Sequence, residues 1–409
     1  MSLTSAKKSL ELWFPFTPGV IGIDEAETGA VHNRPFGSVL AEITAAAEWE
    51  VEQCYFTDEN HQYTSKAEVT NRFFPVSFRR HYSSRRGARQ WSMRALAHVL
   101  FSPPQALGIF FAYGRFAKAL ACAARLRRVP YFVIVGGWYN RISRSQRSYF
   151  DRAFRVFVHT EMQKQELVRV GYRADNIEIF PLGIDNALFT PKTADQYGWT
   201  NNGPRLLYVG RLQPSKGPME ALMAFAVVKQ NFPNARLQIV GPCNDESFRQ
   251  QMINYADVNG LTASVTFAGP IPYEMLPDLY QQSDLFLFPS PYEGLPSVVL
   301  ESMACGTPPV VMRGSGGTEE ALVDGECGWV MDMPRLAYDV LQLLRNQEEI
   351  RRRGENAARR IEDCYSARRT YDILMRNLSE MSTLYGPIKV VSPSLRSVVE
   401  KSAVGTKCL

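Results

Sequence analysis

Short apolar runs alternate with amphipathic stretches through the second half of the chain. The apolar runs are bounded by turn-forming residues, which is typical of buried strands in a parallel sheet. They predict strands at residues 205–209, 236–240, 265–268, 284–288 and 308–312. The stretches between them have helical periodicity and predict helices at residues 218–231, 246–259, 273–281 and 297–304. This alternation predicts a parallel, doubly wound sheet.

The first half of the chain has a similar but less regular pattern. It predicts strands at residues 10–16, 51–56, 108–111, 131–135 and 155–159, and helices at residues 36–47 and 115–128. We therefore expect an α/β protein with two Rossmann-like, doubly wound domains facing a cleft. We expect an N-terminal domain at residues 1–190 and a turn-rich linker at residues 191–204. A C-terminal domain with closing helices would follow at residues 205–386, and a loose tail at residues 387–409.

Length and composition support this organisation. A chain of 409 residues is long enough for two domains, and 45% hydrophobic with 21% charged residues is typical of a globular protein. No apolar run approaches the ~20 residues of a membrane span, and the N-terminus makes a poor signal peptide, so we expect the chain to start at or near Met1. The seven cysteines are scattered and never spaced as C-x-x-C, which suits reduced thiols in a cytoplasmic protein.

The positive charge is concentrated in the first half. Residues 69–150 contain fifteen Lys and Arg and no Asp or Glu. Such a basic region attracts phosphate groups. Three partners stay open: an anionic membrane surface bound through residues 72–147, a phosphorylated or diphosphate-linked acceptor, and a nucleic acid. The last is disfavoured because no nucleic-acid-binding module accompanies the region. The alternative is that the basic region is an ordinary solvent-exposed face that binds no partner.

An acid-turn-helix unit in the second half carries candidate chemistry. Glu293 precedes a Gly-Leu-Pro turn at the carboxyl end of an expected strand, and Glu301 follows eight residues later on the expected helix. Open α/β sheets bind ligands at this edge, and a helix N-terminus with a nearby Gly294 suits a diphosphate. Glu301 would then reach the hydroxyls of an attached ribose, and Glu293 would face what lies beyond the second phosphate. Taken alone, such a pair is more often two solvated charges.

Two cations lie on another strand-to-helix loop. Arg211 and Lys216 stand between Gly210 and Gly217 and can neutralise a leaving diphosphate. The loop lacks the G-x-x-x-x-G-K-[ST] pattern of a P-loop. The segment Gly314-Ser-Gly-Gly317 is a further candidate for the phosphate site.

These motifs together resemble the donor domain of glycosyltransferase family 4, the retaining "glycosyl transferases group 1" with the GT-B fold. The resemblance rests on G-R-x-x-x-x-K-G, I-V-G, the Phe267/Gly269 pair, P-S-x-x-E-G-L-P-x-x-x-x-E-x-M-A-C-G and G-G-x-x-E-x-x-x-D-G, in that order. It is dense over residues 206–330. A looser likeness at residues 180–185 has Leu182 where the family usually has Asn.

The resemblance implies roles for individual residues. Arg211, Lys216 and Glu293 would be catalytic, with Arg211 and Lys216 on the nucleotide diphosphate and Glu293 on the donor sugar. The remaining donor-binding residues would be Gly210, Pro270, Ile271, Gly294, Leu295, Pro296, Ser297 and Glu301, with Pro270 and Ile271 at the base and Glu301 at the ribose. No D-x-D is present, so we expect no metal and no cofactor, with the charge of the leaving group met by cations and the helix dipole.

The first domain departs from the family pattern. Members often carry a His after the fourth strand, where this chain has residues 134–140, Ile-Val-Gly-Gly-Trp-Tyr-Asn. The candidate residues on the acceptor side are Gly22, Gly136, Gly137, Trp138 and Asn140. A strand end with a packed Trp is an equally good interpretation of this segment. The histidines show no metal-ligand spacing.

We therefore expect a retaining glycosyltransferase. It would move a sugar from a UDP- or GDP-sugar to a hydroxyl of a lipid-linked or cell-surface glycan intermediate, in the cytoplasm and at the membrane surface. In the absence of an assured pair of catalytic carboxylates, front-face displacement is the mechanism that the resemblance favours. A nucleotide-sugar epimerase of the same fold and a non-catalytic nucleotide-sugar-binding partner in glycan assembly are the alternatives.

Overall fold

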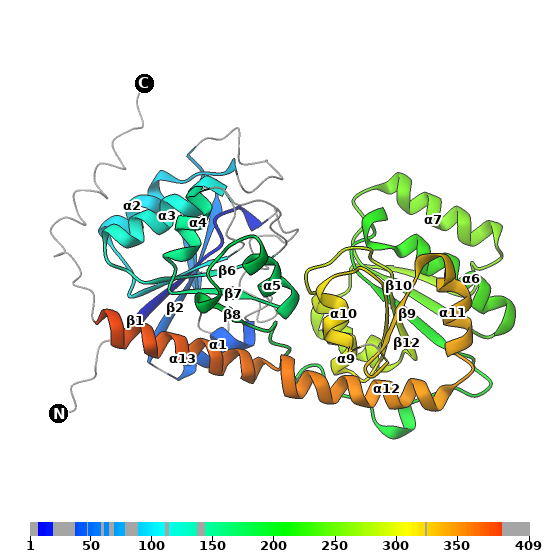
Figure 1. The fold of residues 1–409 in the computed structure, drawn as a ribbon. Helices are drawn as coiled ribbons and strands as arrows, with labels where there is room; N and C mark the ends of the chain where they lie inside the picture. Colours follow the sequence, from blue (N-terminus) through cyan, green and yellow to red (C-terminus); the bar gives the residue numbers. More distant parts are fainter. Residues whose placement is uncertain are drawn as a thin grey trace. The chain divides into compact units, whose positions relative to one another are not determined.

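A computed structural model gives the fold as two compact units, each described by itself below (Figure 1). Unit 1 comprises residues 1–158, 164–180 and 370–409, and unit 2 comprises residues 159–163 and 181–369. The structure describes residues 7–18, 37–46, 48–58, 61–64, 69–77, 89–110, 114–136, 144–323 and 325–386. None of the helices in these ranges combines the length and the apolar character that crossing a bilayer requires.

The sheet of unit 2 is parallel throughout its described strands. Its order is β11-β10-β9-β12-β13-β14, with Leu237 opposite Leu206 and Phe286 opposite Leu207. The strands are β9 (Arg205–Val209), β10 (Arg236–Val240), β11 (Val265–Gly269), β12 (Leu285–Phe288), β13 (Pro309–Met312) and β14 (Trp329–Met331). The strand order reverses between β9 and β12, which is the point where doubly wound sheets bind ligands.

Helices cover both faces of this sheet (Figure 1). α6 packs with α11, while α8, α9 and α12 form a second group. Their bounds are α6 (Pro218–Asn231), α7 (Glu246–Val258), α8 (Leu276–Gln281), α9 (Ser297–Ala304), α10 (Gly317–Leu322), α11 (Leu336–Leu343) and α12 (Gln347–Arg360). The strands β12, β13 and β14 are fully buried, as expected for apolar runs without alternation, whereas the edge strand β11 is mostly partly exposed.

The sheet of unit 1 is mixed. Its order is β3-β4-β2-β1-β5-β6-β7-β8, and β3 alone among these strands is antiparallel, with His61 opposite Phe73. The strands are β1 (Lys8–Trp13), β2 (Trp49–Thr57), β3 (His61–Thr64), β4 (Thr70–Pro75), β5 (Ala106–Phe110), β6 (Tyr131–Ile134), β7 (Arg155–Val158) and β8 (Ile177–Ile179). An antiparallel edge strand on a parallel sheet is common in this fold class.

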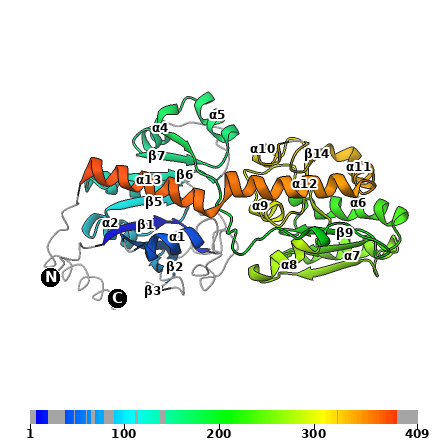
Figure 2. The same ribbon diagram turned by 90° about the horizontal axis from the view of Figure 1, so that it is seen from below.

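In unit 1, α1 and α13 lie on the face of the sheet opposite α2 and α3 (Figures 1 and 2). The bounds are α1 (Gly37–Ala45), α2 (Met93–Phe101), α3 (Gly114–Leu126), α4 (Arg144–Asp151), α5 (Glu161–Arg169) and α13 (Ala367–Tyr385). Polar contacts bind α13 to β7 and β8. Arg155 bonds to Asn377 (3.0 Å) and to Glu380 (3.0 Å), and Arg376 pairs with Glu178 on β8.

These contacts give domain limits that differ from those expected from the sequence. The C-terminal helix belongs to unit 1 from Thr370 onward, rather than closing a C-terminal domain at residues 205–386. The chain enters unit 2 at Pro181, ahead of the expected limit at residue 190. The expected tail, residues 387–409, lies outside the described residues.

The expected linker, residues 191–204, is part of unit 2. Lys192 is 6% exposed, its backbone N–H donates to Cys305 O (3.1 Å), and its ammonium donates to Ser283 O (2.6 Å). Burial lowers the pKa of Lys192 to about 8, although the nearby Asp284 opposes the shift. Asp284 is also buried, which raises the pKa of its carboxyl to about 6. The turn-forming residues of 191–204 therefore belong to an ordered segment that packs on unit 2, and they do not form a flexible linker.

The lowered pKa of Lys192 predicts that the stability of the protein depends on pH. Its pKa is lower in the folded protein than in the unfolded chain, so the unfolded state binds the extra proton between about pH 8 and pH 10.5. The contribution of Lys192 to the free energy of unfolding is therefore greatest above pH 10.5. It decreases as the pH falls through the window and is lost at about pH 8. We expect Lys192→Met to remove a rise of up to about 3 kcal/mol across the window, measured by urea unfolding.

The matched control is Lys164→Met on α5, a partly exposed lysine whose removal leaves the pH slope in place. Equal slopes for the wild type and Lys192→Met across this window would contradict the assignment.

Candidate functional site

Three loops meet at the carboxyl edge of the unit 2 sheet. They follow β9 (residues 210–217), β12 (residues 289–296) and β13 (residues 313–316). The hydroxyl of Ser290 lies 3.3 Å from Ser215 O, which joins the first two loops. The backbone N–H of Glu293 donates to Ser315 O (3.1 Å), which joins the second to the third. The sheet order thus brings together the segments that carry the expected diphosphate residues.

Glycines permit the close contact between these loops. Gly217 has a φ of 74°, and a Cβ there would lie 2.3 Å from Pro289 O. A Cβ on Gly317 would lie 1.9 Å from Gly294 O. Both distances are shorter than heavy atoms tolerate, so a side chain at either position would push the loops apart.

The loop after β9 is held by a buried phenol. Tyr208 is fully buried, and its hydroxyl lies 3.3 Å from Arg211 O and 3.2 Å from Lys216 O. Burial raises the pKa of Tyr208, so the hydroxyl keeps its proton and donates to these carbonyl groups. One side chain therefore fixes the backbone of both cationic residues, with a 3₁₀ turn at Pro214–Lys216 between them.

Lys216 and Glu293 form an ion pair. The ammonium lies 2.5 Å from Glu293 Oε1, and the Ser290 hydroxyl donates to the same oxygen (2.7 Å). The two side chains are 20% and 12% exposed, so water screens them less than a surface pair. Arg211 is exposed and makes no ion pair with any described residue. Both predicted cations and the first predicted carboxylate therefore share one edge of the sheet.

The second carboxylate is enclosed. Glu301 on α9 is fully buried, and Tyr280 on α8 donates a hydrogen bond to its Oε2 (3.1 Å). The thiol of Cys305, one turn later, has its pKa raised by burial and further by the charge of Glu301. The structure thus places Glu301 in the same helix as the other candidates but shows it against α8 and not open to solvent.

The start of α9 matches the expected anion site. The helix begins at Ser297, Pro296 is the residue before its first turn, and no side chain caps it. An uncapped helix N-terminus leaves backbone N–H groups for an anion. The side chain of Leu295 packs in the core, which anchors the turn next to α9. Gly294 lies against the third loop through the close approach of Gly317.

The expected base-binding residues follow the neighbouring strand β11. Gly241 N–H donates to Gly269 O (2.9 Å), so the ends of β10 and β11 lie side by side at the same edge. Pro270 is exposed, and Ile271 is partly buried against the core. Gly210 contacts the end of β10 through its N–H, which donates to Val240 O (2.9 Å).

The expected acceptor-side residues fall mostly outside the described part of the chain. Gly136 is described and follows the end of β6 as a partly exposed residue. Gly22, Gly137, Trp138 and Asn140 lie in ranges that the structure does not describe.

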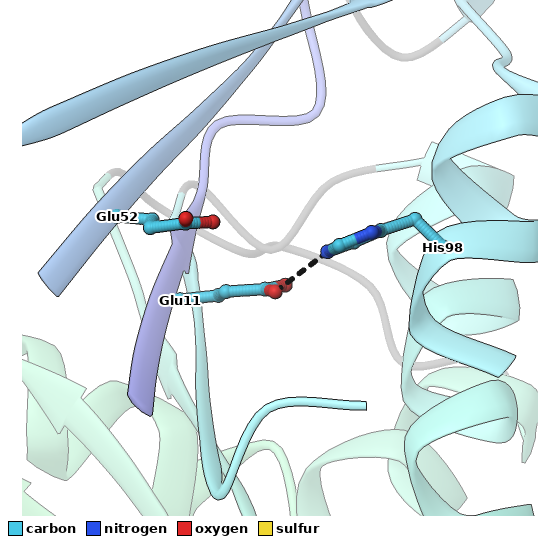
Figure 3. Close-up of side chains that lie close together, drawn as sticks. All are labelled: Glu11, Glu52 and His98. Atoms are coloured by element: carbon cyan, nitrogen blue, oxygen red, sulfur yellow. Dashed lines mark hydrogen bonds and ion pairs between the residues drawn. The ribbon is translucent and has the colours of Figure 1, made fainter. Parts of the chain in front are cut away.

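A separate cluster in unit 1 was not predicted (Figure 3). Its members are Glu11 on β1, Glu52 on β2 and His98 on α2, with ligand atoms within 4.8 Å of one another. His98 Nε2 lies 2.7 Å from Glu11 Oε1, and Trp13 donates to Glu11 Oε2 (2.8 Å). Arg72 donates to Glu52 Oε1 (2.6 Å).

These contacts give the cluster a structural interpretation. The Glu52 pKa is raised, chiefly by burial, while the charge of Arg72 opposes the rise. Both oxygens of Glu11 already have partners, and the imidazole nitrogen nearest the carboxylates is engaged with Glu11. The side chains thus satisfy one another and tie α2 and β4 to the centre of the sheet, as a buried ion-pair network does.

Sequence reasoning missed three supporting residues of the unit 2 site. Ser290 and Tyr280 hold Glu293 and Glu301, and Tyr208 holds the cationic loop. Ser290 stands three residues before Glu293 on the same turn, which is a readable local signal. Tyr208 lies in an apolar run and Tyr280 on a short expected helix, and neither position signals a polar role, so their hydroxyl contacts become visible only in three dimensions.

The comparisons with known proteins bear on this part of the chain. Residues 189–360 match the family model described as glycosyl transferases group 1. The chain carries a glycosyl transferases group 1 domain. D-inositol 3-phosphate glycosyltransferases of Acidothermus cellulolyticus and Mycolicibacterium smegmatis are 35% and 34% identical to it, over 44% of this chain and 42% of theirs. The chain thus spans about half the length of the curated relatives it matches.

Solved structures resemble more of the chain. Sucrose-phosphate synthase from Thermosynechococcus elongatus has a TM-score of 0.71 at 18% identity and covers 92% of this chain and 100% of its own. Anabaena Alr3699/HepE has a TM-score of 0.68 at 17% identity, covering 91% and 100%. At such identities the likeness concerns the fold, and it confirms the expected GT-B fold beyond the group 1 domain.

Tyr208→Phe tests the support of the cationic loop. The change removes a hydroxyl that donates to the Arg211 and Lys216 carbonyl groups, and a hydrogen bond of this kind contributes about 1 kcal/mol. We therefore expect amide hydrogen exchange in residues 211–217 to accelerate about fivefold, measured by mass spectrometry.

Tyr172→Phe is the matched control. It removes a buried phenol oxygen that has no hydrogen-bond partner among the described residues. Unchanged exchange in Tyr208→Phe, or an equal change in the control, would show that the hydroxyl does not hold the loop.

Proposed function

We propose that this chain is a retaining glycosyltransferase that moves a sugar from a nucleoside diphosphate sugar to an acceptor hydroxyl. The observation that carries the proposal is the meeting of Lys216, Glu293 and the uncapped N-terminus of α9 at the carboxyl edge of β9 and β12. A cation and a helix N-terminus together suit a diphosphate, and a carboxylate beside them suits sugar hydroxyls.

The names of the relatives support a nucleotide-sugar donor. Structures of Anabaena Alr3699/HepE are described with UDP and glucose and with UDP-glucose, and an Escherichia coli relative with UDP-2-fluoro glucose. We extend this chemistry to the present chain, with a UDP-sugar as the first donor to test and a GDP-sugar as the second.

The proposed reaction is a front-face displacement. The acceptor oxygen forms a bond to the anomeric carbon as the bond from that carbon to the distal phosphate oxygen breaks. The acceptor proton passes to the leaving phosphate, which departs with the bonding electron pair. Lys216, Arg211 and the first turn of α9 stabilise the charge that develops on the diphosphate. No metal is required in this proposal, because these groups already supply the positive charge.

Glu293 has a double part in this scheme. In the described structure it neutralises Lys216 at 2.5 Å. An incoming diphosphate competes for the same ammonium, which frees the carboxylate to accept hydrogen bonds from the donor sugar. Ser290 keeps the carboxylate in place throughout, because it donates to the oxygen that Lys216 also contacts.

We propose that the acceptor carries phosphate. Residues 69–150 contain fifteen Lys and Arg and no Asp or Glu, and the curated relatives are named for a phosphorylated polyol. A lipid-linked glycan diphosphate is the acceptor we favour, and a phosphorylated polyol is the second. Retention at the anomeric carbon is part of the same proposal and follows from the family resemblance.

Donor binding gives the first test. We expect one member of a panel of UDP-, GDP- and ADP-sugars to bind without metal in calorimetric titration. We expect Glu301→Gln to weaken that binding about 30-fold, because a charge-assisted hydrogen bond contributes about 2 kcal/mol. Thermal unfolding of the variant separates a donor contact from a purely structural role of this buried side chain.

Glu246→Gln on α7, which removes an exposed carboxylate paired with Arg249, is the control for charge. Absence of binding to the wild type by every sugar nucleotide would overturn the donor site. Product analysis with acceptor present then distinguishes the alternatives, since an epimerase consumes donor without an acceptor and a non-catalytic partner never consumes it.

Transition-state stabilisation by Lys216 gives the second test. We expect Lys216→Met to lower kcat by about 100-fold or more, and donor affinity by less, because the charge on the diphosphate grows as the sugar bond breaks. Lys229→Met on α6 removes the same charge away from the site and should leave both quantities unchanged. Equal losses in kcat and in affinity would instead assign Lys216 to ground-state binding.

A further inference from the structure

Unpaired arginines gather at one edge of unit 1. Arg125, Arg127 and Arg128 end α3 just before β6, and Arg152 follows α4 just before β7. Because β6 and β7 are parallel neighbours, residues that immediately precede them lie at the amino edge of the sheet. None of these four side chains forms an ion pair with a residue that the structure describes. We call these residues, with Leu126, Leu384 and Tyr385, the amino-edge patch.

Many surface arginines of unit 2, in contrast, have a carboxylate partner, although Arg211 has none among the described residues. The pairs are Arg249–Glu246, Arg313–Asp332, Arg335–Asp339, Arg351–Glu355 and Arg352–Glu349. In unit 1 the carboxylates of α13 and β8 are already engaged, since Glu380 and Glu178 pair with Arg155. The charge of the amino-edge patch is therefore left for an external anion.

Exposed apolar side chains accompany the arginines. Leu126 is 77% exposed within the run Arg125-Leu-Arg-Arg128, and Leu384 is 71% and Tyr385 50% exposed at the end of α13. The two segments lie close together, because Tyr385, Arg125 and Arg152 all act electrostatically on the phenol of Tyr131 at the start of β6. Large apolar side chains between unpaired cations are typical of surfaces that enter the headgroup region of a bilayer.

Arg128 occupies a position that normally selects glycine. It ends α3 with a φ of 60°, while Arg128 N–H donates to Arg125 O (3.0 Å) and Val129 N–H to Ala124 O (2.8 Å). This is the Schellman arrangement, in which glycine is preferred because a Cβ disfavours the left-handed region. Arginine therefore lowers the stability of the helix end. Its side chain makes no polar contact among the described residues that would offset this cost.

Arg127 adds an unsatisfied donor. Its Nε is buried and has no hydrogen-bond partner in the described residues. The outer nitrogens of a guanidinium form a fork of donors that suits phosphate oxygens.

We propose that the amino-edge patch docks unit 1 on an anionic phospholipid surface, with the arginines on lipid phosphates and Leu126, Leu384 and Tyr385 among the headgroups. This inference does not rest on the proposed transfer reaction. The patch lies at the amino edge of the unit 1 sheet, whereas parallel sheets bind their ligands at the carboxyl edge.

The test is co-sedimentation of the full chain with vesicles. We expect binding to phosphatidylglycerol vesicles that weakens as salt rises, and no binding to vesicles of pure phosphatidylcholine. Arg128→Gly is the informative variant, because it relieves the left-handed strain. We expect it to raise the melting temperature while weakening vesicle binding about fivefold, since each arginine near an anionic surface adds that much.

A triple change, Arg125→Gln with Arg127→Gln and Arg128→Gln, should weaken binding about 100-fold. The matched control removes the same charge from unit 2 through Arg249→Gln, Arg313→Gln and Arg335→Gln, and should bind like the wild type. Leu126→Ser should weaken binding at constant charge. Equal binding to neutral vesicles, equal loss in both triple variants, or tighter binding to a DNA duplex with the same dependence on Arg128 would each overturn the proposal.

Discussion

The ion pair between Lys216 and Glu293 organises the edge of unit 2 where the candidate site lies. The two residues are 77 positions apart in the chain, and they meet because β9 and β12 are neighbours at the point where the strand order reverses. The pair forms only if the two loops approach within van der Waals distance. Gly217 supplies that approach, and Tyr208 and Ser290 fix the two backbones that carry the charges.

A partly buried ion pair contributes little net stability, and breaking one by removing a partner is costly. An anion that arrives at this edge replaces Glu293 as the partner of the Lys216 ammonium, and the released carboxylate then needs hydrogen-bond donors of its own. The Lys216 ammonium thus pairs with Glu293 before the anion binds and with the anion afterwards. Many surface arginines of unit 2 have a carboxylate partner, whereas the four arginines at the amino edge of unit 1 have none among the described residues.

The local sequence pattern was sufficient to predict helices and strands whose apolar periodicity matches their burial in the fold. Residues 205–209 and 218–231 were predicted with the bounds of β9 and α6, because apolar residues flanked by glycine or proline leave few alternatives. The pattern missed β14, which has three residues, and α2 and β4, which lie within the basic region where charges obscure the periodicity. The motifs located Lys216 and Glu293 correctly on their loops. The partners Tyr208 and Tyr280 and the full burial of Glu301 depend on the packing of strands and helices distant in sequence, which periodicity does not encode.

The crossing of α13 into unit 1 affects how the chain is made. Residues 181–369 of unit 2 form one continuous segment, whereas unit 1 lacks the helix that covers β7 and β8 until Thr370 and the residues after it have been synthesised. Domains generally fold as units during synthesis, N-terminal first. Here the sheet of unit 1 is begun before unit 2, but β7 and β8 gain their contacts with α13 only after residues 181–369 of unit 2 have been synthesised.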